Sequence, residues 1–80
     1  MNYDLAIMAL EGLTRAPMKI RVENGGVVIE GPGASFKELA RLCLLMGSAQ
    51  SSAEDGIELQ SGTHLTRESP NLRLNLAQDS

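Results

Sequence analysis

The feature that most restricts how this chain can fold is a β-hairpin centred on Asn24 and Gly25. Apolar and polar residues alternate on both sides of this pair, over residues 18–23 and 26–30, as they do in strands with one buried face. Asn-Gly is the preferred pair for a two-residue type I′ turn, because both turn residues need a positive φ. These residues therefore predict two antiparallel strands joined by a tight turn.

A two-residue turn also fixes which residues face each other across the hairpin. On the polar face of the hairpin, Lys19 lies opposite Glu30, and these two side chains carry opposite charges that attract each other. The apolar residues share one face as two opposed pairs, Val22 with Val27 and Ile20 with Ile29. Because one register satisfies both faces, the sequence predicts the pairing of the strands as well as their existence.

Residues 36–46 predict a helix, which follows a break at Gly31-Pro32-Gly33 and ends before Gly47. Ser35 and Glu38 have the spacing of a capping box, in which each side chain bonds to the other residue's backbone N–H. The apolar positions at spacings of three and four form one stripe, composed of Phe36, Leu39, Ala40, Cys43 and Met46. We therefore expect Cys43 to be a small buried side chain rather than a reactive thiol.

Two further strands are predicted by the alternating segments 57–60 and 72–76. The first sixteen residues are ambiguous, because Leu5, Met8 and Ala9 suit a helix face whereas Leu5, Ile7 and Ala9 alternate as in a strand. We interpret this stretch as a short helix, for which Asp4 is a candidate cap. Residues 78–80 are expected to fray.

Together these elements predict a single α+β domain over residues 1–80, with the order β-β-α-β-β after the N-terminal element of residues 1–16. A small antiparallel sheet would bury one face under the helix of residues 36–46 and leave the other face wet. Eighty residues are close to the lower limit for a self-sufficient core, so a marginal monomer and an oligomer both stay open.

Composition argues against two classes of partner. Aromatic residues make up only 2% of the chain, which leaves few faces for stacking nucleic-acid bases. The net charge is −3, and five acidic residues after residue 50 face only two arginines. An acidic surface repels phosphate, so we expect no nucleic-acid partner.

The start of the chain lacks a basic signal region, and the longest apolar run, residues 42–46, is too short for a bilayer. These two features predict a cytoplasmic protein without membrane contact.

Residues that could support catalysis or metal binding are few. One histidine and one cysteine cannot supply a closed structural zinc site, and no pattern places His64 beside Cys43. The glycines of residues 31–35 lack the lysine of a phosphate-binding loop. We therefore expect no enzymatic activity, no catalytic residue, no metal and no cofactor.

Two groups of residues are candidates for binding another protein. Glu54, Asp55 and Glu58 would attract a basic partner, although the same charges also serve solubility. Leu44, with the leucines on either side of it, makes the helix more apolar than one sheet face requires. Additional core burial would explain this excess, and a surface for a partner or for self-association is the alternative.

Three segments between Lys19 and Ala77 resemble the polymorphic-toxin immunity protein family thirty-two. They are Ile29-Glu30-Gly31, the helix phrase Phe36-Lys37-Glu38-Leu39-Ala40-Arg41-Leu42, and Ile57-Glu58-Leu59 followed by Leu65-Thr66-Arg67-Glu68-Ser69-Pro70-Asn71-Leu72-Arg73-Leu74. The resemblance implies a bacterial protein that neutralises a co-produced toxin by covering its active site or partner surface. An acidic last third would suit a basic, nuclease-like toxin. We expect a small non-catalytic protein-binding module of this immunity type, with a self-associating structural or regulatory homodimer as the alternative.

Overall fold

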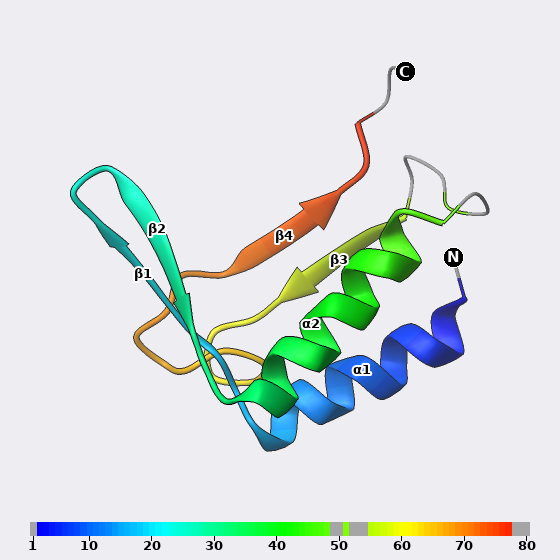
Figure 1. Ribbon diagram of the computed structural model, residues 1–80, viewed down its shortest axis with the longest axis horizontal. Helices are drawn as coiled ribbons and strands as arrows, with labels where there is room; N and C mark the ends of the chain where they lie inside the picture. The colour runs from blue at the N-terminus through cyan, green and yellow to red at the C-terminus, as the bar shows by residue number, and fades with distance from the viewer. Residues whose placement is uncertain (1, 49–50, 52–54, 78–80) are drawn as a thin grey trace.

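The computed structural model describes residues 2–48, 51 and 55–77, and this part of the chain contains two helices and two small antiparallel sheets (Figure 1). In chain order the elements are α1 (Tyr3–Arg15), β1 (Lys19–Glu23), β2 (Gly26–Glu30), α2 (Gly33–Met46), β3 (Gly56–Leu59) and β4 (Leu72–Asn75). The α+β class is confirmed. The single predicted sheet is wrong, because β1 pairs with β2 and β3 pairs with β4 in separate sheets.

The hairpin has the register that its sequence predicts. Val22 pairs with Val27, and the turn residues Asn24 and Gly25 have φ values of 51° and 77°, as a type I′ turn requires. Its outer half does not reach the core, however, since Val22 and Val27 are 67% and 65% exposed. In Figure 1 the tip of the hairpin projects away from both helices, so only its base contributes to the core.

The free edge of β1 is occupied by the segment that connects β3 to β4, which explains why one continuous sheet does not form. The N–H of Met18 donates to the carbonyl of His64 at 3.2 Å, and the N–H of Thr66 donates to the carbonyl of Met18 at 2.9 Å. The N–H of Ile20 then donates to Ser69 Oγ at 2.8 Å. These bonds use the backbone groups that another strand would have needed.

Helix α1 confirms the interpretation of the N-terminal stretch, but with a different cap and a different buried face. Asn2 rather than Asp4 is the N-cap, because its Oδ1 accepts the N–H of Leu5 at 3.2 Å. Leu5 and Met8, which were expected on the core face, are 49% and 61% exposed. The residues that α1 buries are Ala6, Ala9, Gly12 and Leu13.

Helix α2 begins earlier than expected, and the predicted capping box is wrong. Its N-cap is Pro32, whereas Ser35 lies inside the helix and is fully buried. The Ser35 hydroxyl donates to the carbonyl of Ala16 at 2.5 Å, at the end of α1. Burial of Ser35 turns the helix so that Leu42 faces the core, which corrects the expected stripe. Three residues of that stripe, Phe36, Ala40 and Cys43, are exposed.

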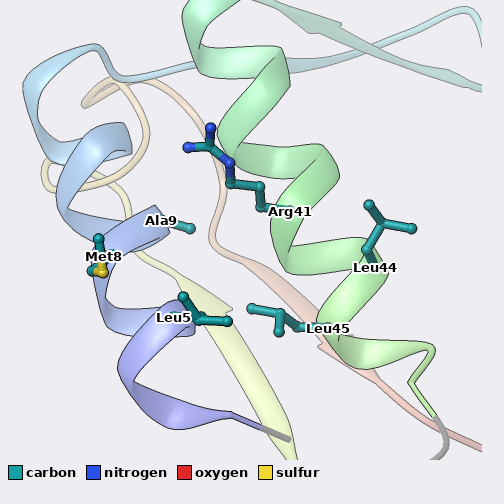
Figure 2. A pocket seen from close by; sticks show the side chains of 6 residues that line it. All are labelled: Leu5, Met8, Ala9, Arg41, Leu44 and Leu45. Carbon is teal, nitrogen blue, oxygen red and sulfur yellow. The ribbon is translucent and has the colours of Figure 1, made fainter.

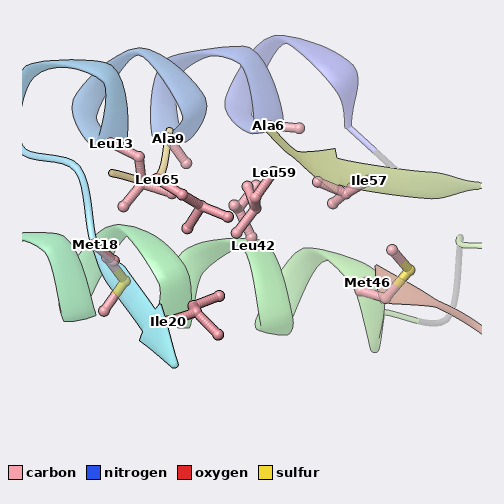
Figure 3. Packing of buried hydrophobic residues seen from close by; sticks show 10 residues of the cluster. All are labelled: Ala6, Ala9, Leu13, Met18, Ile20, Leu42, Met46, Ile57, Leu59 and Leu65. Atoms are coloured by element: carbon pink, nitrogen blue, oxygen red, sulfur yellow. The ribbon is translucent and has the colours of Figure 1, made fainter. Parts of the chain in front are cut away.

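The core is aliphatic and lies between the two helices and β3 (Figure 3). Leu13 of α1, Leu42 of α2 and Leu59 of β3 all belong to this core and have almost no exposure. Its members are Ala6, Ala9, Leu13, Met18, Ile20, Leu42, Met46, Ile57, Leu59 and Leu65. Neither helix in the described ranges has the length and apolar character needed to cross a membrane.

Candidate functional site: an apolar pocket between the helices

An open pocket with a cavity volume of about 420 Å³ lies between α1 and α2. Its lining residues are Leu5, Met8 and Ala9 of α1 and Arg41, Leu44 and Leu45 of α2. Figure 2 shows Leu5 and Leu45 pointing toward each other from the two helices, while the Arg41 side chain reaches from α2 toward α1. The pocket is therefore apolar at its centre and bordered by one cationic group.

The packing of the helices explains where the pocket opens. At Gly12 the helices approach so closely that a Cβ atom would overlap the side chain of Glu38. In Figure 1 the helices are closest near this end of α1 and diverge toward its N-terminus. Leu5 and Met8 border this diverging half of the helix pair. Because α2 does not cover them there, both side chains remain accessible.

The charged residues at the pocket differ between its two edges. Arg41 on α2 is held by Glu38, whose Oε1 lies 2.6 Å from Arg41 Nη1, and the Arg41 side chain is still 66% exposed. Lys37 precedes it on the exposed side of α2, whereas α1 carries the exposed acids Asp4 and Glu11 together with the exposed base Arg15. An edge of net positive charge on α2 and an edge of net negative charge on α1 therefore flank the same apolar surface.

The residues that the sequence nominates for partner binding are not brought together. Leu44 lines the pocket and is 76% exposed. Asp55 is buried and accepts a hydrogen bond from the Tyr3 hydroxyl, so it is not part of an accessible acidic surface. Glu58 is exposed on β3 and pairs with Arg73 at 3.6 Å. Glu54 lies outside the described residues.

His64 has a structural role in this fold. Its Nδ1 accepts the N–H of Gln60 at 3.1 Å, and partial burial lowers the pKa of its imidazole. Cys43 is exposed on α2, which corrects the expectation that it is buried. Over residues 2–48, 51 and 55–77, no three His, Cys, Asp or Glu side chains form a group that could hold a metal ion.

Comparison with known proteins adds no relative: no family model, no curated protein and no solved structure matches this chain. Its function is therefore argued from the surface itself. Of the pocket residues, the sequence pointed to Leu44 through the excess of leucines. Leu5 and Met8 were missed because their spacing suits a buried helix face equally well.

Proposed function

We propose that this protein is a non-catalytic protein-binding module and that the pocket between α1 and α2 is its contact surface. The observation that carries the proposal is the gathering of large exposed apolar side chains there, namely Leu5, Met8 and Leu44. Single exposed apolar residues are normal, but a group of them lining one hollow is typical of an interaction site. The flexible methionine side chain also adapts readily to the shape of a partner.

The pocket suits a protein surface better than a small polar ligand. Small-molecule sites are concave and combine apolar walls with several convergent polar groups. Here the one charged lining residue is Arg41, and Glu38 already binds it. An apolar side chain from another protein would gain contact with the leucines and would leave this ion pair in place.

The proposal is tested by comparing the proteins that bind the wild-type chain and two glutamate variants. Leu44→Glu places a charge in the pocket, and Val27→Glu places the same charge on a similarly exposed residue of the hairpin tip. We expect a stoichiometric partner from a native lysate, including untagged copies of this chain, to be lost with Leu44→Glu and kept with Val27→Glu. Equal recovery with all three baits would place the contact surface elsewhere, and circular dichroism checks that both variants fold.

An immunity-type inhibitor of a basic toxin is the second candidate. Its support is the resemblance between residues 19 and 77 and the acidic last third of the sequence. Of the three acids expected in its footprint, Glu58 is exposed, and it shares its strand pair with the exposed Arg73. The hypothesis predicts a basic partner that dissociates as salt rises and binds less tightly to Glu58→Lys. Binding that is insensitive to both changes would remove the acidic footprint.

A further inference from the structure

The two edges of the pocket carry net charges of opposite sign. On α1, Asp4, Met8, Glu11 and Arg15 are spaced by four, three and four residues, so they share one exposed face of the helix. On α2, Lys37, Arg41 and Leu44 have the same spacing and also share one exposed face. Each row therefore holds one apolar residue, and the α1 row has a net negative charge from two acids and one base whereas the α2 row has a net positive charge from two bases.

Such a surface is complementary to a copy of itself. Building on the protein-binding role proposed for this pocket, we propose that its occupant is a second copy of the chain, related by a twofold axis that runs parallel to α1 and α2. Rotation about this axis exchanges the edges, so that α1 of each copy lies on α2 of the other. An isologous contact of this kind repeats every interaction twice.

The heights of the residues along the helices agree with this arrangement. The two helices run in opposite directions, with Leu5 facing Leu45 and Gly12 lying against Glu38 (Figures 1 and 2). A twofold axis parallel to the helices preserves these heights. Glu11 of one copy then lies at the level of Lys37 and Arg41 of the other copy. Met8 then lies between the levels of Arg41 and Leu44, at the mouth of the second copy's pocket.

Two observations favour a second copy over a different protein. A groove for a basic or an acidic helix would present mainly one sign of charge, whereas this surface has a net negative row on α1 and a net positive row on α2. The chain is also small for a self-sufficient core, and Leu5, Met8 and Leu44 remain outside that core. Pairing two copies would cover these side chains without any new sequence element.

The first experiment is sedimentation of the full chain at low salt over a range of concentrations. We expect a reversible monomer–dimer equilibrium, with a dissociation constant raised about tenfold or more by Leu44→Glu and unchanged by Val27→Glu. A wild-type chain that stays monomeric at every concentration would overturn the dimer. If the wild-type chain is monomeric but Leu44→Glu abolishes the capture of a different protein, the protein-binding role of the pocket stands without the dimer. If Leu44→Glu also leaves that capture unchanged, both the dimer and the protein-binding role of the pocket are wrong.

A charge exchange tests the geometry of the dimer. Glu11→Lys and Lys37→Glu each create two like-charge pairs in a homodimer, so each variant alone is expected to dimerise less than the wild-type chain. Mixing the two variants restores both opposite-charge pairs. At one contact the introduced lysine of the first variant would meet the introduced glutamate of the second, and at the other contact the original Lys37 and Glu11 would meet. We expect heterodimers to form preferentially and to weaken as salt rises. A mixture that forms no more dimer than the single variants would overturn the placement of α1 on α2.

Discussion

Two buried serines connect backbone segments that lie far apart in the sequence. Ser35 donates to the carbonyl of Ala16 at the end of α1, and Ser69 accepts the N–H of Ile20 in β1. Ser69 also lies 2.8 Å from the hydroxyl of Thr66, which fixes its orientation. Each hydroxyl satisfies a backbone group that regular secondary structure leaves without a partner. These serines therefore position the elements relative to one another.

Replacing Ser69 with alanine should destabilise the protein by about 1–3 kcal/mol, because the buried N–H of Ile20 loses its acceptor. Ser61→Ala is the matched control, since the Ser61 hydroxyl is exposed and donates to the carbonyl of Arg67 at 2.9 Å. We expect the control to change the free energy of unfolding by less than about 0.5 kcal/mol. Urea denaturation measures the free energy of unfolding of each variant. Equal stability of the two variants would show that the Ile20–Ser69 bond stabilises the fold no more than the exposed bond of Ser61 does.

The single histidine gives the protein a predictable pH dependence. Burial lowers the pKa of His64 below its ordinary value of 6.5, and protonation of Nδ1 would also remove the bond from Gln60. Between the two pKa values the unfolded chain binds more protons than the folded chain. The free energy of unfolding therefore rises with pH through this window and becomes level above it.

The variant His64→Asn should flatten this dependence, because its amide oxygen can replace the Nδ1 acceptor and does not titrate. Urea denaturation midpoints between about pH 5.5 and 7.5 compare the variant with the wild-type chain across the ordinary range of a histidine pKa. A proton NMR titration follows the one imidazole directly. An NMR pKa above 6.5 in the folded protein would contradict the prediction and reverse the expected slope.

At the scale of elements, the hairpin depends on its turn. Gly25 has a φ of 77°, in the left-handed region that disfavours a side chain, although nothing within 4 Å would clash with a Cβ atom. Gly25→Ala should therefore cost about 1–2 kcal/mol through backbone strain alone. Gly33→Ala is the control, because Gly33 also has open space around it but no positive φ, and it begins α2. If thermal denaturation showed the same loss for both alanines, strain at the turn would not be the cause.

The elements that could be predicted from the sequence are those specified by neighbouring residues. Asn24-Gly25 determines the hairpin register locally, and alternation places β3 and β4 within one residue of their ends. The buried face of α2 could not be predicted in this way, because apolar residues surround most of the helix. Phe36 and Leu42 both suit a core, and only the position of α1 decides that Leu42 is buried. The pocket depends on the same long-range packing, so local patterns identified Leu44 without its neighbours.

At the scale of the whole molecule, each sheet is too small to be stable alone. A two-stranded sheet needs packing against other elements, and here bonds between distant residues supply the connections. One of them joins the Tyr3 hydroxyl at the start of α1 to Asp55, which precedes β3. It holds the first turn of α1 against the far side of the core, fifty-two positions away in the sequence. No local pattern predicts such a contact, because neither residue has a neighbour that signals it.

Tyr3→Phe removes this hydroxyl and keeps the ring, so it isolates the contribution of the bond to Asp55. We expect a loss of about 1–3 kcal/mol, because the bond is partly buried and Asp55 is itself buried. Thr14→Val removes a hydroxyl from the same helix, but that hydroxyl bonds locally to the carbonyl of Leu10 at 3.0 Å. A local bond of this kind competes with the helix rather than joining elements, so the control should change stability little. Urea denaturation at low protein concentration measures the free energy of unfolding of both variants. A Tyr3→Phe variant as stable as the wild-type chain would mean that helix packing alone, through Ala6, Ala9 and Leu13, holds α1 in place.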